Sequence, residues 1–104
     1  MKLTIDRDRY SITINKEEIN LPRKQFEILW LLCSVPGKVF SRHTIFEKIW
    51  GNESTSDERT VDVHIANLRK KVGSEFFHTI KGIGFKVLIE KVELKNGSES
   101  VTSS

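Results

Sequence analysis

The chain has 104 residues, a formal net charge of +3 and a single cysteine, and it is 38% hydrophobic and 30% charged. This length and composition are typical of one small folded domain, since disordered chains have fewer apolar residues and a larger charge imbalance. No apolar run approaches the roughly 20 residues that span a bilayer, and the N-terminus has no apolar signal core. One cysteine forms no internal disulfide, so secretion is not indicated and a cytoplasmic protein is predicted.

Basic residues are unevenly distributed along the chain. Residues 1–58 are neutral, with nine basic and nine acidic side chains, whereas residues 59–91 carry seven basic side chains against three acidic ones. A local excess of positive charge is typical of a surface that meets phosphate groups. Because many charged faces are only solvated, this excess by itself is weak evidence for nucleic-acid binding.

The first half of the chain predicts strands followed by two helices. Apolar residues alternate with polar ones over residues 3–19, which is typical of half-buried strands joined by a tight turn. Pro22 suits the first turn of a helix that is apolar on nearly every side over residues 26–33, so we expect this helix at the centre of the core. Ser41 is a good N-cap for a second helix, which ends at Gly51.

A third helix is predicted over about residues 57–72, where Ser56 or Asp57 can cap its start and Gly73 ends it. At about 100° per residue, one face of this helix carries an apolar stripe, formed by Val61, Ile65, Leu68 and Val72. The opposite face collects cations at both ends, two small apolar residues and one amide, namely Arg59, Val63, Ala66, Asn67 and Lys70.

That opposite face suits the major groove of DNA. The Asn67 amide can pair with adenine through two hydrogen bonds, and Val63 and Ala66 can contact a thymine methyl group. Arg59 and Lys70 can reach phosphates. The alternative is that Val63 and Ala66 are merely small exposed residues, which are common on protein surfaces.

A hairpin and a tail follow the third helix. Two strands over about residues 77–89 flank a Lys-Gly-Ile-Gly turn, a pattern that predicts a β-hairpin. Residues 92–104 are polar and serine-rich, which predicts a flexible tail. The folded domain is therefore expected over residues 1–91.

The third helix and the hairpin together resemble the C-terminal effector domain of OmpR/PhoB-type response regulators. The similarity rests on residues 59–72, Arg-Thr-Val-Asp-Val-His-Ile-Ala-Asn-Leu-Arg-Lys-Lys-Val, and on residues 79–85, Thr-Ile-Lys-Gly-Ile-Gly-Phe. Residues 21–32 and 37–42 are similar to that family's first helix and to its lead-in to the second. The resemblance covers about residues 3–90 and implies an α+β winged helix-turn-helix, with an N-terminal antiparallel sheet, three helices and a C-terminal β-hairpin wing.

The resemblance also implies a function: sequence-specific binding of double-stranded DNA by the effector domain of a two-component response regulator that controls transcription. The third helix would enter the major groove and the wing would lie at the minor groove. The residues implied to read bases are Val63, Ala66 and Asn67. The residues implied to contact phosphates or the grooves are Arg42, Trp50, Arg59, Thr60, His64, Arg69, Lys70, Thr79 and Lys81.

Further partners are implied by the same resemblance. Members of this family usually bind directly repeated half-sites as tandem dimers. One loop matches the segment that can contact RNA polymerase, namely Gly51, Asn52, Glu53, Ser54, Thr55, Ser56 and Asp57. The family's receiver domain is not found here, since nothing at Asp6 or Asp8 supplies its acidic cluster. The chain is therefore either a separated effector domain or a naturally lone one, and the sequence leaves both open.

Three positions in the third helix and the wing depart from the family pattern. Lys81 stands where the wing usually has arginine, Phe85 where it has tyrosine, and Ala66 where many relatives have a long basic side chain. Lysine keeps the charge but lacks the planar fork that fits a narrow minor groove. We therefore expect fewer direct base contacts and a greater dependence on Asn67, on backbone charges and on DNA shape.

Other functional classes fit the sequence less well. The three histidines are too scattered for a zinc site, and no motif arranges a nucleophile, a base and an orienting acid, so neither a cofactor nor an enzyme is predicted. Cys33 lies in the apolar first helix and is expected to be a core thiol. The remaining alternative is a winged-helix module that binds protein instead of DNA. Such a module should present an apolar patch anchored by aromatic residues, which the outer face of the third helix lacks.

Overall fold

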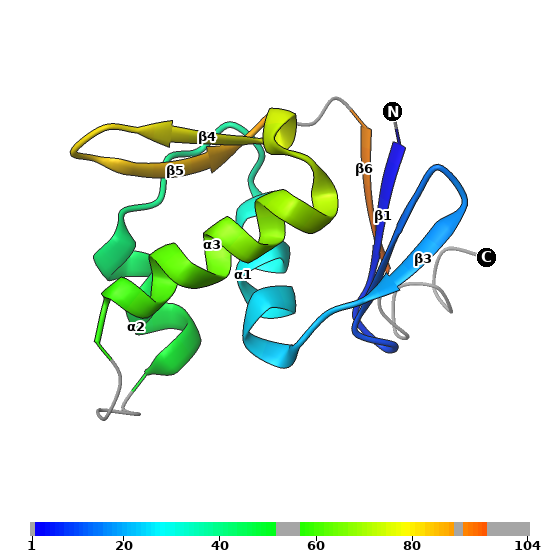
Figure 1. Ribbon diagram of the computed structural model, residues 1–104, viewed down its shortest axis with the longest axis horizontal. Helices are drawn as coiled ribbons and strands as arrows, with labels where there is room; N and C mark the ends of the chain where they lie inside the picture. Colours follow the sequence, from blue (N-terminus) through cyan, green and yellow to red (C-terminus); the bar gives the residue numbers. More distant parts are fainter. Residues whose placement is uncertain (1, 52–56, 89–90, 96–104) are drawn as a thin grey trace.

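The computed structural model describes residues 2–51, 57–88 and 91–95. Its elements in chain order are β1 (Lys2–Asp6), β2 (Ser11–Ile14), β3 (Glu17–Asn20), α1 (Arg23–Ser34), α2 (Arg42–Trp50), α3 (Arg59–Val72), the 3-10 turn η1 (Ser74–Phe76), β4 (Phe77–Ile80), β5 (Gly84–Val87) and β6 (Lys91–Lys95). Figure 1 shows the N-terminal sheet on one side of the helices and the β4–β5 hairpin at the opposite end. The predicted α+β winged helix-turn-helix is confirmed.

The N-terminal sheet has the strand order β3-β2-β1-β6. Its first three strands pair antiparallel, as predicted, with Ile5 opposite Ile12 and Ile12 opposite Ile19. Leu3, Ile5 and Ile12 are fully buried, because alternate residues of a strand point to the same face. Strand β6 lies parallel to β1, with Leu3 opposite Val92, so the complete sheet is mixed.

The tail predicted over residues 92–104 is wrong for residues 92–95. These residues belong to β6, and their pairing with β1 satisfies backbone groups that a free tail would leave to water. The serine-rich composition that predicted a tail belongs to the residues beyond this strand, whereas Val92 and Leu94 alternate with charged residues, as in a strand. Residues 96–104 lie outside the described residues.

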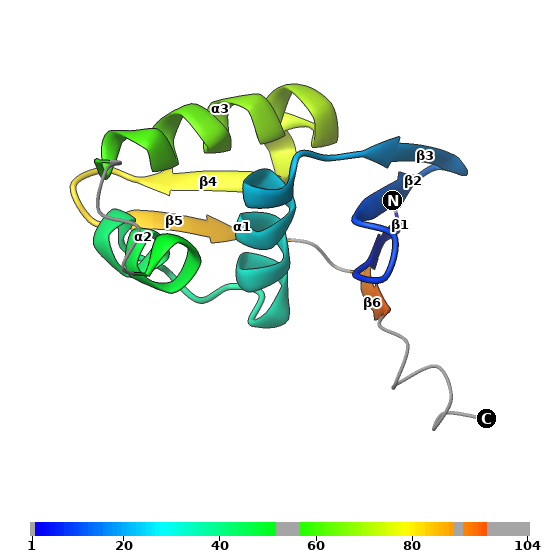
Figure 2. The ribbon, with the colours of Figure 1, turned by 90° about the horizontal axis from the view of Figure 1, so that it is seen from below.

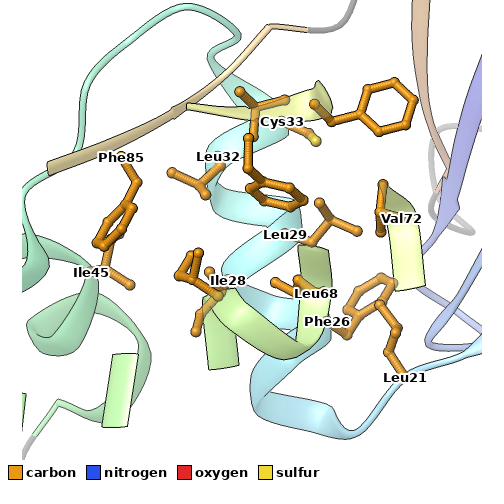
Figure 3. Packing of buried hydrophobic residues seen from close by; sticks show 14 of the residues in the cluster. Leu21, Phe26, Ile28, Leu29, Leu32, Cys33, Ile45, Leu68, Val72 and Phe85 are labelled. Carbon is orange, nitrogen blue, oxygen red and sulfur yellow. The ribbon is translucent and has the colours of Figure 1, made fainter. Parts of the chain in front are cut away.

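Helix α1 lies at the centre of the core, as its composition predicts. Its side chains pack against α2, α3 and β5 (Figure 3), in a cluster that includes Phe26, Ile28, Leu29, Leu32, Ile45, Leu68, Val72 and Phe85. Cys33 is buried in the same cluster, and this burial raises the pKa of its thiol to about 12. The prediction of a core thiol is confirmed.

The helix boundaries largely follow the predicted caps. The Ser41 hydroxyl accepts a hydrogen bond from the backbone N–H of Thr44 at 3.0 Å and caps α2. The cap predicted for α3 at Asp57 is wrong by one residue, since the N-cap is Glu58, which makes no side-chain cap hydrogen bond. The Asp57 carboxylate still accepts a hydrogen bond from the backbone N–H of Arg59 at 2.6 Å, at the positive end of α3. None of these helices, within the described part of the chain, is long and apolar enough to cross a membrane.

The β4–β5 hairpin, called the wing below, is tied to the segment that precedes α2. Phe40 and Phe85 exchange two backbone hydrogen bonds, of 2.8 and 2.9 Å. A Cβ atom at Gly84 would lie 2.1 Å from the Phe40 carbonyl oxygen, so only glycine permits this approach. The hairpin prediction is confirmed, and its second strand ends at Val87.

Candidate nucleic-acid interface

Helix α3 buries one face and presents the other to solvent, as its periodicity predicts. The predicted apolar stripe is at most 4% exposed, and it comprises Val61, Ile65, Leu68 and Val72. On the opposite side Val63 is 59% exposed, and Ala66 is exposed beside the half-buried Asn67. The three residues predicted to read bases therefore lie on the outward side of one helix.

The cations at the ends of this face are available to a polyanion. Arg59 is the first residue of α3. Its side chain is 85% exposed, and its guanidinium lies 3.1 Å from the Asp57 carboxylate. The hydrogen bonds from the Arg59 backbone and side chain lower the pKa of Asp57. Lys70 is exposed in the last turn, and Thr60 is half-buried in the first.

Arg42 and Asp62 join α2 to α3 across the exposed side of the molecule. The Nη2 atom of Arg42 lies 2.9 Å from Oδ2 of Asp62, and Nε donates to Oδ1 at 3.2 Å. The two side chains are 49% and 40% exposed, so the predicted phosphate contact at Arg42 is held by a partner and still open to solvent. Sequence reasoning left Asp62 out of the site, because its pairing depends on how the two helices pack.

Trp50 lies beneath α3 and packs there. It is only 6% exposed, and its ring stacks against Phe46 and His64 with centroids 5.4 and 5.5 Å apart. Lys24 lies over the same ring at 5.3 Å. Burial and, to a lesser extent, the Lys24 charge lower the pKa of His64. The phosphate contacts predicted for Trp50 and His64 stay predictions, and only a small part of the Trp50 side chain is available for one.

The wing lies alongside α3, at the end of the molecule away from the N-terminal sheet (Figure 2). A guanidinium N–H of Arg69 donates to the Thr79 hydroxyl and joins α3 to β4. Lys81 is exposed in the wing turn, where the neighbouring Ile83 is 63% exposed. Sequence reasoning did not select Ile83, although an apolar residue in a hairpin turn is a recognisable signal.

A cleft separates the wing from the start of α2. It is lined by Arg42 and His43 of α2 and by Thr79 and Ile83 of the wing, among others. His43 was not predicted to take part in the site. Its Nδ1 atom lies 2.6 Å from a carboxylate oxygen of Glu58, which ties α2 to the start of α3.

The predicted polymerase-contact loop is described only at its two ends. Gly51 is exposed and ends α2 with a φ of 58°, while Asp57 precedes α3. The intervening residues, Asn52, Glu53, Ser54, Thr55 and Ser56, lie outside the described residues. The contact with RNA polymerase therefore stays a prediction.

Comparisons with known proteins agree on one family. Residues 16–87 match the family of transcriptional regulatory protein C-terminal domains. The heme response regulator HssR of Staphylococcus saprophyticus is 45% identical over 89 residues, which cover 82% of this chain and 40% of that protein. This chain thus spans about two fifths of the length of the curated relatives it matches.

Solved structures agree with that match. The crystal structure of the DNA-binding domain of Bacillus subtilis CssR superposes with a TM-score of 0.76 at 28% identity, covering 84% of this chain and 100% of that one. The DNA-binding domain of the response regulator AdeR, solved in complex with an intercistronic region, gives a TM-score of 0.75 at 29% identity and covers 85% and 95%. The family is one of transcription regulators and not of enzymes. The chain therefore belongs to the transcriptional regulatory protein C-terminal domains, and its resemblance to OmpR/PhoB-type effector domains is confirmed.

Proposed function

We propose that this domain binds double-stranded DNA sequence-specifically and controls transcription as the effector domain of a response regulator. The observation that carries the proposal is the outward side of α3, where the exposed Val63 and Ala66 flank the Asn67 amide and cations stand at both ends. The major groove of B-DNA, about 12 Å wide, admits a helix of this kind. The protein-interaction alternative is not favoured, because α3 has no Phe, Tyr or Trp along its length.

Each part of the surface has its own task in this proposal. The side chains of Val63, Ala66 and Asn67 read base edges, while the cations around them neutralise phosphates and set the register on the duplex. The wing meets the neighbouring minor groove through Lys81. Its link to α3 supports this arrangement, because a side-chain hydrogen bond from Arg69 to Thr79 joins the helix directly to the wing.

Partners beyond one duplex belong to the same proposal. We infer that the domain acts in the cytoplasm, occupies direct repeats as a tandem dimer, and contacts RNA polymerase through the loop that follows α2. A receiver domain would regulate this pairing in a longer protein. The coverage of about two fifths of HssR supports this inference, since the rest of that regulator is long enough for another domain.

Selection of bound duplexes from a random DNA pool tests the proposal. Enrichment of a directly repeated motif is expected. The affinity for that motif should fall steeply with salt, because each phosphate contact adds about −0.9 to the slope of log affinity against log salt concentration. Salt-sensitive binding without enrichment would contradict sequence reading by the isolated domain. A complete lack of binding at low salt would contradict DNA binding and favour a protein partner.

A further inference from the structure

We propose that Asp62 is a positioning residue for DNA binding, whose carboxylate holds the Arg42 guanidinium between α3 and the wing so that the arginine meets a phosphate. This inference rests on the function proposed above. It assigns a favourable role to an acidic side chain in a surface that binds an anion.

The geometry of the pair leaves Arg42 held and still able to bind. Its Nε and Nη2 atoms contact the two oxygens of Asp62, at 3.2 and 2.9 Å. A guanidinium has five N–H groups in a rigid fork, so this pairing leaves three of them for another acceptor. About half of the Arg42 side chain is exposed, and it also lines the cleft beside Thr79 and Ile83 of the wing. The unpaired side of the guanidinium is thus available where the helix and the wing both approach DNA.

Fixing Arg42 before binding has an energetic consequence. A free arginine loses rotamer freedom when it grips a phosphate, and that loss subtracts from the affinity. Asp62 imposes the restriction in the unbound protein, so less freedom remains to be lost on DNA. Both hydrogen-bond contacts of the Asp62 carboxylate within the described residues go to Arg42. The Asp57 carboxylate, by contrast, also accepts a hydrogen bond from the backbone N–H of Arg59 at the start of α3.

The negative charge of Asp62, considered alone, predicts the opposite effect on DNA affinity. Asp62 is 40% exposed beside the proposed phosphate contacts, so its negative charge repels DNA. If that repulsion dominates, removal of the charge strengthens binding whether or not Arg42 is present. If positioning dominates, removal of the charge weakens binding only while Arg42 is present. The two forecasts differ in sign, which makes them easy to separate.

A double-mutant cycle tests the proposal in the 104-residue chain. Affinities of the wild type, Asp62→Asn, Arg42→Ala and the double variant are measured by fluorescence anisotropy, on the duplex chosen by the selection above and on a shuffled duplex. We expect Asp62→Asn to weaken binding by about threefold to tenfold in the wild type. In the Arg42→Ala background the same change should leave binding equal or stronger. Arg42→Ala itself should reduce the log–log salt slope by about one.

A second ion pair supplies matched controls. Arg9 and Glu18 lie 3.8 Å apart, and Glu18 belongs to β3 of the N-terminal sheet. This sheet lies at the opposite end of the molecule from the wing turn (Figure 1). Arg9→Ala and Glu18→Gln make the same charge changes there, and both should leave the affinity nearly unchanged. Thermal unfolding of every variant checks the fold, and exposed pairs of this kind contribute little to stability.

Three outcomes would count against the inference. If Asp62→Asn strengthens binding, or has the same effect in both backgrounds, Asp62 does not position Arg42, although the proposed function stands. If Asp62→Asn fails to fold, Asp62→Glu decides, because it keeps the charge and displaces the carboxylate; unchanged affinity would overturn the inference. If the wild type binds neither duplex at low salt, the proposed function fails and the inference fails with it.

Discussion

Arg69, in the last turns of α3, donates a hydrogen bond to the Thr79 hydroxyl in β4, so side chains as well as the η1 turn join the helix to the wing. The Nε atom of Arg69 is buried and has no hydrogen-bond partner within the described residues. Both residues were predicted as phosphate contacts. The structure adds that they hydrogen-bond to each other and so link α3 to the wing.

Thr79→Val should weaken binding to all duplexes by a similar factor. Valine keeps the shape of threonine but removes the acceptor of the Arg69 hydrogen bond, which is worth about 1 kcal/mol, and the wing loses its side-chain link. Base preference should change little, since Val63 and Asn67 are untouched. Anisotropy titrations on specific and shuffled duplexes measure both, with Thr13→Val in the N-terminal sheet as control. An unchanged affinity would show that the link is not needed on DNA.

Gly84→Ala should destabilise the domain more than Gly82→Ala. A Cβ at Gly84 would lie 2.1 Å from the Phe40 carbonyl oxygen, so the wing must move, at a cost of about 1–3 kcal/mol. Gly82 has open space around it, and its φ of 77° alone costs alanine about 1 kcal/mol. Urea unfolding gives both values. Equal losses of stability in the two variants would mean that the backbone at Phe40 shifts at little energetic cost.

The sequence predicts best those features that local periodicity determines. The buried stripe of α3 follows from the helical repeat, and the cap at Ser41 follows from the chemistry of one side chain. Features that depend on distant partners were missed. Strand β6 pairs with β1 across nearly the whole chain, and the link between Arg42 and Asp62 depends on how two helices pack.

His43 should make the domain less stable as the pH rises above about 6.5. The hydrogen bond with Glu58, followed by the charges of Glu47 and Glu58, raises the pKa of His43 in the folded state. Its stabilising effect is therefore complete below the unfolded value of about 6.5 and is lost as the pH rises through the raised folded pKa. His43→Gln should flatten this dependence in thermal melts over that range. An unchanged pH profile would contradict the pairing.

His64 should have the opposite effect on the pH dependence of stability, making the domain less stable as the pH falls. Burial, and after it the Lys24 charge, lower the pKa of His64, so the folded state favours the neutral ring. Stability is then lost as the pH falls through about 6.5 toward the lowered folded value. His64→Gln should reduce the acid sensitivity of the melting temperature while leaving in place the loss of stability that His43 causes at higher pH. Parallel shifts in both variants would show that the two titrations are not independent.

Asn67 and Lys81 should differ in what they contribute to DNA binding. Asn67 is the amide on the outward side of α3, so Asn67→Ala should relax base preference at one position by about 1–3 kcal/mol. Lys81 is exposed in the wing turn, and Lys81→Ala should weaken binding to every sequence and flatten the salt slope by about one. Titrations against single-base variants of the selected duplex separate the two effects. If both variants only scale the affinity uniformly, Asn67 does not read a base, and the specificity of this domain must come from DNA shape.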